Sequence, residues 1–267
     1  MNSTKFRRRG ELPGVEVMEV VDSQRAWRSV TSSFELMMPE SWSGYVAYGG
    51  TRHWVEPGML FCPGPGDTFE ISRAQVPGSF RVLVIEREAL GAALAPHRLS
   101  PESLDFHRIM RDTPAELLLA LRRLLDDLQR ESSKSTLQAS WHELVAVLAS
   151  HLGGASRRAR GAGNLPAAER VRELIHAGLE GALNLGTLSR ETGLSRFQVL
   201  RAFKRAYGLP PHAYQLCYRI ERAKRLLCMG HRPAYVATEL CFSDQSHLNR
   251  HFKRLLGVTP SEYAAAG

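Results

Sequence analysis

The sequence predicts an α+β chain of two domains: a β-rich N-terminal domain that ends in a pair of helices, and an all-α C-terminal domain with two helix-turn-helix units. Three observations carry this prediction. Short apolar runs separated by Pro-Gly pairs fill residues 32–86, a run of small and basic residues interrupts the chain at 153–166, and a motif occurs twice after it. With 267 residues, of which 43% are hydrophobic, the chain can bury two cores.

The apolar runs between residues 32 and 86 have the length and alternation of β-strands. They are SFELMM, GYVAYGG, GMLF and SFRVLVI, and Pro-Gly pairs stand between them at 57–58, 63–66 and 77–78. Because short strands with closely spaced Gly and Pro turns are typical of all-β folds, we expect a small barrel or sandwich here.

Two helical stretches follow the β-rich segment, at about residues 113–152. In the first, Pro114 to Gln129, leucines recur at three- and four-residue steps and form one stripe on a helix. The second, Leu137 to Leu152, has the same periodicity. Such stripes cover a sheet or form the seam of a homodimer, and the sequence leaves both interpretations open.

Residues 153–166, GGASRRARGAGNLP, have the composition of a flexible linker. The linker divides the chain into domains at 1–152 and 167–267. Residues 157–263 hold 18 Lys and Arg against 8 Asp and Glu, whereas the rest of the chain holds 17 against 19. A basic domain beside a nearly neutral one favours a polyanionic partner for the basic domain.

Composition also argues against membrane and secreted proteins. The sequence has no run of about 18 apolar residues, and its first ten residues are polar, so we expect no membrane segment and a cytoplasmic location. The four cysteines include no Cys-x-x-Cys pair, which predicts reduced thiols that are mostly buried.

An internal repeat is the strongest signal in the sequence. Arg201 to Tyr214 aligns without gaps on Arg250 to Tyr263, with the shared pattern R-x-F-K-R-x-x-G-x-x-P-x-x-Y. A repeat of this kind indicates that one supersecondary unit is used twice.

Each copy is interpreted as the second helix of a helix-turn-helix. In the first copy, a short helix capped by Asn184 ends at Thr192, Gly193 turns the chain, and Ser195 caps the next helix with Gln198 in an S-x-x-Q capping box. Asp244 is the counterpart of Ser195 and is also a good N-cap.

The helical period gives each second helix an apolar back and a basic front. A front of Arg, Lys, Gln, Ser and His suits a DNA major groove, because these side chains donate to base edges and phosphates. The candidates for base contacts are Arg196, Phe197, Gln198, Arg201, Gln245, Ser246, His247 and Arg250. The candidates for phosphate contacts, through side chains or capped amides, are Ser195, Lys204, Asp244 and Lys253.

The segment between the copies predicts the spacing of the two helices. Pro211 to Met229 has the pattern of one helix ended by Gly230, and at ~1.5 Å per residue it spans about 28 Å. Two recognition helices held so far apart can enter successive major grooves, which repeat about every 34 Å.

These residues resemble the AraC/XylS family of bacterial transcription regulators. The signature of that family is matched by Ala237 to Tyr263, and the resemblance covers about Ala167 to Tyr263. It implies two helix-turn-helix subdomains joined by a long helix, which bind double-stranded promoter DNA and contact RNA polymerase, typically as an activator. Three residues depart from the common pattern: Cys241 stands where Gly is usual, Leu248 where Phe is common and Ser189 where Ala is common.

The N-terminal part looks like the cupin-like barrel that senses a small effector or forms a dimer in this family. The resemblance therefore implies a sequence-specific, non-enzymatic regulator without a cofactor or metal. Aromatic and histidine residues near the predicted strands are candidates for an effector pocket: Trp42, Tyr45, His53 and Trp54.

Two alternatives predict different behaviour. A metal-dependent cupin enzyme needs closely spaced ligands, but His53 has no H-x-H partner, and Glu56, His97 and His107 do not complete a set. A non-specific architectural DNA binder fits the same basic charge but predicts binding with little preference among sequences.

Overall fold

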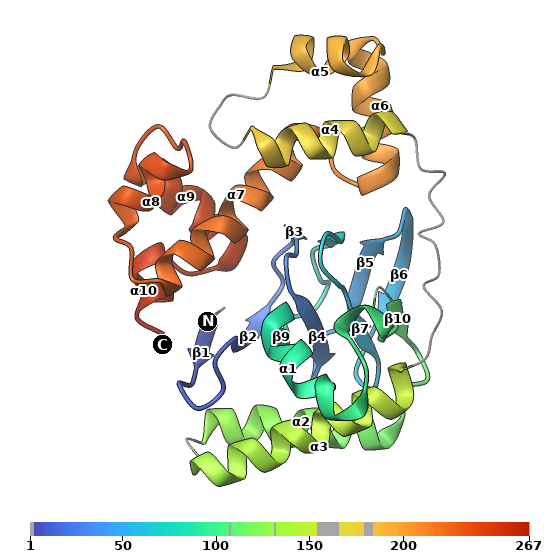
Figure 1. The fold of residues 1–267 in the computed structure, drawn as a ribbon, viewed down its shortest axis with the longest axis vertical. Coiled ribbons are helices and arrows are strands. Elements are labelled where there is room, and N and C mark those ends of the chain that lie inside the picture. Colours follow the sequence, from blue (N-terminus) through green and yellow to red (C-terminus); the bar gives the residue numbers. More distant parts are fainter. Residues whose placement is uncertain (1–2, 107, 131, 154–165, 179–183, 267) are drawn as a thin grey trace.

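The computed structural model describes residues 3–106, 108–130, 132–153, 166–178 and 184–266. Figure 1 shows a β-rich domain with a helix pair on one side and an all-helical domain on the other. The predicted two-domain α+β class is confirmed. Most of the predicted linker, and His107, lie outside the described residues.

The β-rich domain is a sandwich of two antiparallel sheets. The larger sheet has the order β1-β2-β9-β4-β7-β10, and the smaller has the order β3-β8-β5-β6. Among the described strands, no pairing joins the two sheets, so the predicted barrel is an open, cupin-like sandwich. The strands are β1 (Ser3–Arg8), β2 (Val15–Ser23), β3 (Trp27–Val30), β4 (Phe34–Pro39), β5 (Gly44–Tyr48), β6 (Thr51–Val55), β7 (Leu60–Cys62), β8 (Thr68–Ile71), β9 (Gly78–Ile85) and β10 (Arg108–Met110).

Glycine sets the tightest turn of the sandwich. Tyr48 pairs with Thr51 across β5 and β6, so only Gly49 and Gly50 connect these strands. Both glycines have positive φ, at 59° and 80°, as a two-residue hairpin of type I′ requires.

The larger sheet is buried on both faces. Along β9, Phe80, Val82 and Val84 pack against the smaller sheet, whereas Leu83 and Ile85 pack under the helices. Those helices are α1 (Arg87–Leu94), α2 (Ala115–Gln129) and α3 (Lys134–Leu152), with two short 3₁₀ turns at Ala95–His97 and Pro101–Ser103. This two-sided burial explains why β9 is almost continuously apolar.

The leucine stripe of α2 belongs to this core. Leu117, Leu121, Leu124 and Leu125 are each 0% exposed and pack in one cluster with the sheet and α3. Figure 1 shows α2 and α3 side by side beneath the sandwich. The stripe therefore covers its own sheet and is not available as a dimer seam.

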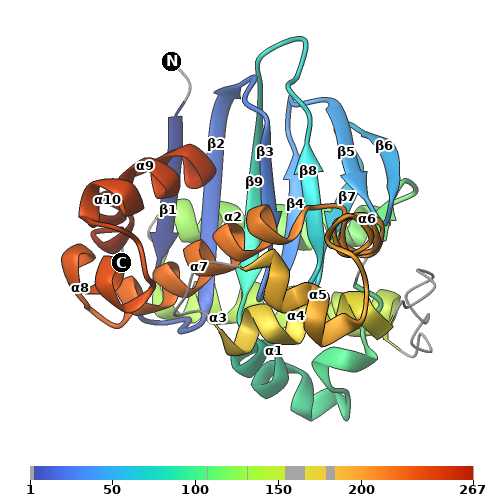
Figure 2. The same ribbon diagram turned by 90° about the horizontal axis from the view of Figure 1, so that it is seen from above.

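The C-terminal domain consists of seven helices in its described part, arranged as two small units on one long helix. The first unit has α4 (Pro166–Ala177), α5 (Leu185–Thr192) and α6 (Arg196–Tyr207), and the second has α8 (Pro233–Glu239), α9 (Gln245–Leu256) and α10 (Pro260–Ala264). Between them, α7 (Pro211–Cys228) crosses from one unit to the other, as Figure 2 shows. None of the helices in the described part of the chain is long and apolar enough to cross a membrane.

Each helical unit has its own core, and the sandwich adds a buried apolar residue to each. Val30 of β3 packs with Phe203 and Tyr214 in the first unit. Phe6 of β1 packs with Phe252 and Tyr263 in the second unit. The two domains are thus joined by buried apolar contacts in addition to the chain itself.

Candidate nucleic-acid interface

The first helix-turn-helix is built as the sequence predicts. Asn184 Oδ1 accepts a hydrogen bond from the Gly186 amide at 2.8 Å, Gly193 turns the chain with φ 68°, and Ser195 caps α6. The Gln198 amide donates to Ser195 Oγ at 3.3 Å, and Gln198 Oε1 accepts from the Ser195 amide at 2.9 Å. This capping box fixes the start of α6.

The second helix-turn-helix has a longer and more strained turn. Five residues, 240–244, separate α8 from α9, whereas three residues, 193–195, separate α5 from α6. Cys241 takes the left-handed conformation with φ 54°, as expected from its place where the family has Gly. A residue with a Cβ is disfavoured there, so this turn stores strain that the first does not.

Asp244 starts α9 in place of the serine that starts α6. Its Oδ1 accepts the His247 amide at 2.7 Å, and this hydrogen bond is the main reason that the Asp244 pKa lies below its ordinary value. The side chain thus satisfies an amide of the first turn that has no partner within the helix.

Both recognition helices turn an apolar side to the core and the predicted DNA-binding side to solvent. Val199 and Phe203 of α6, and Leu248 and Phe252 of α9, are buried. All of the predicted DNA-contact residues are exposed except His247, which is half-buried: Ser195, Arg196, Phe197, Gln198, Arg201, Lys204, Asp244, Gln245, Ser246, Arg250 and Lys253.

Phe197 is unusual for an aromatic residue on a helix surface. Its side chain is 66% exposed, and the guanidinium carbon of Arg201 lies 5.6 Å from its ring centre. Such a pair presents a flat apolar face and a cation together, which suits a thymine methyl beside a base-edge acceptor.

Two of the predicted base-contact residues are engaged within their own helices. Gln198 is held in the capping box of α6. In α9, His247 Nδ1 lies 3.0 Å from Ser243 Oγ, and its Nε2 lies 2.7 Å from His251 Nε2. Both side chains shape the start of a recognition helix, and neither is free to reach a base without giving up these bonds.

His251 is neutral at pH 7. Its pKa is lowered to about 4, first by partial burial and then by the neighbouring charges of Arg254, His247, Arg250 and His212. His251 therefore adds no positive charge to the basic front of α9.

Equivalent ends of the two recognition helices rest on the β-sandwich. At the end of α6, Thr68 Oγ1 of β8 donates to the Tyr207 carbonyl. At the end of α9, Arg25 Nη2 donates to the Lys253 carbonyl at 2.6 Å. A Cβ on Gly257, the C-cap of α9, would lie 2.9 Å from the Thr4 Cβ, so this glycine permits the close approach.

A buried charge cluster links the same two domains. Glu16 of β2 accepts the Tyr263 hydroxyl at 2.6 Å and pairs with Arg8 Nε at 3.0 Å. Lys224 of α7 lies 3.4 Å from a carboxylate oxygen of Glu221 and 3.9 Å from one of Glu16. Burial raises the Glu16 pKa, against the opposing effect of Lys224.

The four residues predicted for an effector pocket lie in three different places. Trp42 is 1% exposed and fills the sandwich core against Phe80. Tyr45 and Trp54 pair across β5 and β6 and stack edge to face at 5.0 Å on the outer face. His53 pairs with Val46 on the opposite face, because side chains alternate along a strand.

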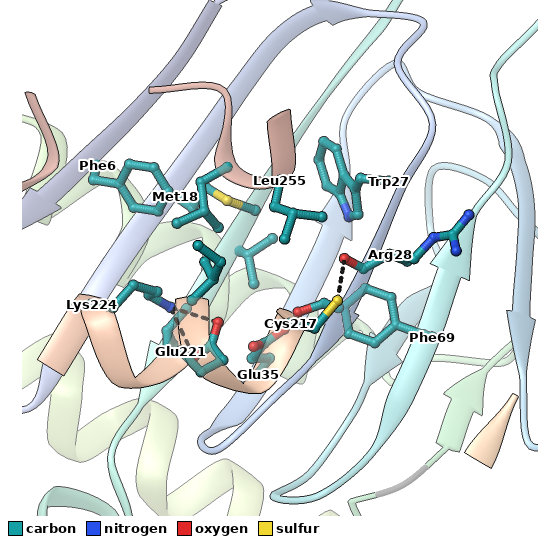
Figure 3. A pocket seen from close by; sticks show the side chains of 15 residues that line it. Phe6, Met18, Trp27, Arg28, Glu35, Phe69, Cys217, Glu221, Lys224 and Leu255 are labelled. Atoms are coloured by element: carbon teal, nitrogen blue, oxygen red, sulfur yellow. Dashed lines mark hydrogen bonds and ion pairs between the residues drawn. The ribbon is translucent and has the colours of Figure 1, made fainter. Parts of the chain in front are cut away.

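A cavity that the sequence did not indicate lies between the domains. Its volume is about 50 Å³, and side chains from β1, β2, β3, β4, β8, β9, α7 and α9 line it. Figure 3 shows Trp27, Phe69, Glu35, Glu221 and Lys224 around this space. Residues so far apart in the chain share no motif, and only the docking of the domains brings them together.

The described residues contain no group of three or more His, Cys, Asp or Glu side chains placed to hold a metal ion. Glu56 accepts a hydrogen bond from Trp54 Nε1 at 2.8 Å at the end of β6, and His97 lies in the 3₁₀ turn after α1.

Comparisons with known proteins agree with this geometry. Residues 188–266 match the helix-turn-helix domain family. The chain is 33% identical over 90 residues to the probable transcriptional regulator LumQ of Photobacterium leiognathi, covering 33% of this chain and 36% of that protein. It is 29% identical over 90 residues to the transcriptional activator AarP of Providencia stuartii, covering 33% of this chain and 67% of AarP. The match thus spans about a third of LumQ.

Solved structures extend the similarity to the whole fold. ToxT of Vibrio cholerae superposes with a TM-score of 0.51 at 11% identity, over 99% of this chain and 97% of ToxT. Another structure, of ToxT with an unsaturated fatty acid bound, gives a TM-score of 0.52 at 14% identity, over 99% and 96% of the two chains. The chain thus shares the two-domain fold of ToxT, and the region around its helix-turn-helix domain is similar to the transcription regulators LumQ and AarP.

Proposed function

We propose that this protein regulates transcription by inserting α6 and α9 into successive major grooves of promoter DNA. The observation that carries the proposal is the matched exposure of Arg201 and Arg250 on two capped helices whose apolar sides are buried. The 18 residues of α7 hold the units apart by about 27 Å, comparable to one turn of DNA.

Direct base contacts are assigned to the exposed side chains that no capping bond occupies. These are Arg196, Phe197, Arg201, Gln245, Ser246 and Arg250. Phosphate contacts are assigned to Lys204, Lys253 and the helix N-termini at Ser195 and Asp244, where backbone amides and the helix dipole favour an anion. Gln198 and His247 shape these N-termini from within the helix.

The test is selection of binding sites from random duplex DNA by the purified full-length protein. A sequence-specific regulator enriches one motif with two sub-sites about one helical turn apart. Enrichment without a motif would favour the architectural alternative, in which counterion release dominates binding. Genome-wide mapping of bound sites then identifies the regulated promoters.

We assign a separate function to each domain. We propose residues 1–152 as the sensing domain, 153–166 as the linker and 167–267 as the DNA-binding domain. A small effector bound by the sensing domain is supported by the fatty acid held by ToxT, a protein of the same fold. We also propose that the protein acts in the cytoplasm through contact with RNA polymerase, and the similarity to the transcriptional activator AarP supports activation rather than repression.

A homodimer, if this regulator forms one, uses a surface other than the leucine stripe of α2, which is buried in its own domain. Light scattering of the full-length protein at micromolar concentration measures this directly. A monomeric mass would mean that one chain reads both sub-sites alone.

A further inference from the structure

The cavity between the domains combines aromatic walls with acidic groups. Phe6, Trp27 and Phe69 of the sandwich line it together with Ile220 and Leu255 of the helical domain. Its volume of about 50 Å³ exceeds the roughly 10–15 Å³ that one water needs, so a molecule of a few non-hydrogen atoms fits. Since so small a cavity admits many small molecules, the polar groups in its wall determine which ligand it binds.

Negative charge is in excess around this cavity. Glu35 and Glu221 line it together with Lys224. A carboxylate oxygen of Glu16 lies 3.9 Å from Lys224 Nζ. Lys224 pairs with Glu221 and Glu16, and Arg8 pairs with Glu16. In the described part of the chain, no basic side chain lies within ion-pair distance of Glu35.

The other charged residue of the lining does not offset this excess. The Arg28 guanidinium is directed away from the cavity, as Figure 3 shows, and lies 3.9 Å from Glu70 with both side chains nearly half exposed. Inside the cavity, the Arg28 backbone carbonyl accepts the Cys217 thiol instead. Glu35 is thus a half-buried acid that faces an aromatic space, and its main opposing charge, Lys224, is paired with Glu221 and Glu16.

We propose that this cavity binds a small organic ammonium ion, held by Glu35 and Glu221 and by the rings of Trp27 and Phe69. A buried carboxylate beside aromatic faces is the chemistry that recognises ammonium groups, through ion pairing and cation–π attraction. The inference rests on the proposed function, since it names the ligand class of the proposed sensing domain.

The chemistry disfavours an anionic effector at this position. A fatty-acid carboxylate would meet the carboxylates of Glu35 and Glu221, and the nearest cation, Lys224, is already paired. Like charges buried together cost several kcal/mol, by the general size of such interactions. The ligand class expected here therefore differs from the fatty acid that ToxT holds, although the fold is shared.

Ionisation of Glu35 supports this assignment and gives it a pH dependence. The Glu35 pKa is raised to about 7, chiefly by burial and also by Glu221 and Glu16, whereas Lys224 and the Thr31 hydroxyl act to lower it. Arg8, Tyr263, Cys217 and Arg28 are further titratable groups around the cavity, and the charge of Arg254 acts on Cys217. Since an ammonium ion binds the ionised carboxylate, its affinity rises as the pH increases through 7.

The ligand would also join the two domains. Glu35 belongs to β4 of the sandwich, whereas Glu221 belongs to α7 of the DNA-binding domain. An ion held by both carboxylates stabilises the docked arrangement in which the ends of α6 and α9 rest on the sandwich. An effector bound here would therefore act on the position of the recognition helices relative to the sandwich.

Calorimetric titration of the full-length protein at pH 8 tests the proposal, with methylammonium chloride and tetramethylammonium chloride as probes. We expect saturable binding of at least one ammonium probe and none of sodium butyrate or of KCl at equal ionic strength. At pH 6 the affinity should fall at least fivefold. The Glu35→Gln variant, nearly isosteric, should bind at least tenfold more weakly, and Glu221→Gln should also lose affinity.

The matched control is Glu88→Gln, which changes an exposed carboxylate on α1 and should bind as the wild type does. Absence of saturable binding by both ammonium probes, equal binding of K⁺, or unchanged affinity in Glu35→Gln would each overturn the proposal. Binding to the selected DNA motif, measured without any probe, decides the proposed function separately. If the protein binds its motif but no ammonium ion, the proposed ligand is wrong and the proposed function stands.

Discussion

Phe6 in the first strand and Tyr263 in the last helix lie edge to face, with their ring centres 4.9 Å apart. Both side chains are buried, and the Arg8 guanidinium carbon lies 4.4 Å from the centre of the same tyrosine ring. The two ends of the chain are therefore packed into one core. Because this core belongs to the second helix-turn-helix unit, the N-terminal strand supports a DNA-binding element directly.

Truncating Phe6 should weaken the second helix-turn-helix unit. The Phe6→Ala variant removes a ring that is 6% exposed, and such substitutions cost about 3 kcal/mol. Urea unfolding followed by circular dichroism measures the loss. Val76→Ala, at a side chain that is 72% exposed, is the control and should change the unfolding free energy by less than about 0.5 kcal/mol. If Phe6→Ala lowers the unfolding free energy no more than Val76→Ala does, the contact between Phe6 and the second unit does not stabilise the fold.

Removing the arginines of the recognition helices should reduce specific DNA binding. Arg201→Ala and Arg250→Ala should each cost about 1–3 kcal/mol on the selected motif and little on random DNA. Lys204→Ala, on the same helix as Arg201, should weaken binding to both DNAs alike and reduce the salt dependence. Fluorescence anisotropy at several salt concentrations measures both effects. Equal losses on both DNAs in the arginine variants would contradict base recognition.

Changing Gln198 should affect the helix more than the sequence preference. Its side chain closes the capping box on Ser195, so Gln198→Ala should lower the unfolding free energy by about 0.5–1 kcal/mol. The selected DNA motif should stay the same. Ser195→Ala removes the other half of the box and is the matched comparison, with a loss of similar size. A changed motif in Gln198→Ala would mean that this side chain leaves the cap to contact bases.

The helical domain could be predicted from sequence because its determinants are local. Caps at Asn184, Ser195 and Asp244 lie within three residues of the amides that they accept, and the repeat places Phe203 and Phe252 at equivalent core positions. Exposure of the basic fronts followed from the same helical period. The engagement of Gln198 was visible in the S-x-x-Q pattern, but its consequence for base contacts needed the geometry.

The cavity proposed to bind an effector could not be found in this way because it is assembled from distant segments. Glu35 and Glu221 are separated by most of the chain and meet only when the domains dock. The aromatic residues predicted near the strands do not line this cavity, since the alternation of β5 and β6 sends Tyr45 and Trp54 outward. Trp42 fills the core instead. Periodicity predicts which face of an element is buried and cannot predict which domain covers it.

Relieving the left-handed backbone at Cys241 should stabilise the second turn. Glycine adopts φ 54° without the steric cost of a Cβ, so Cys241→Gly should raise the unfolding free energy by about 1 kcal/mol. Cys241→Ala keeps the Cβ and removes only the thiol, so this control should show no gain. Urea unfolding of both variants separates the two causes. Equal stabilisation by alanine would assign the effect to the thiol rather than to the backbone.

Lowering the pH should destabilise the protein through His251. In the folded state this histidine takes up a proton only near pH 4, because partial burial and the charges of Arg254 and His247 disfavour its charged form. In the unfolded chain it does so near pH 6.5, so its contribution is fully present above about pH 6.5 and is lost as the pH falls toward 4. Urea unfolding at intervals between pH 7.5 and 4.5 should show a steeper decline for the wild type than for His251→Asn. His97→Asn, at an exposed histidine, should keep the steep decline, and a decline unchanged in His251→Asn would contradict this assignment.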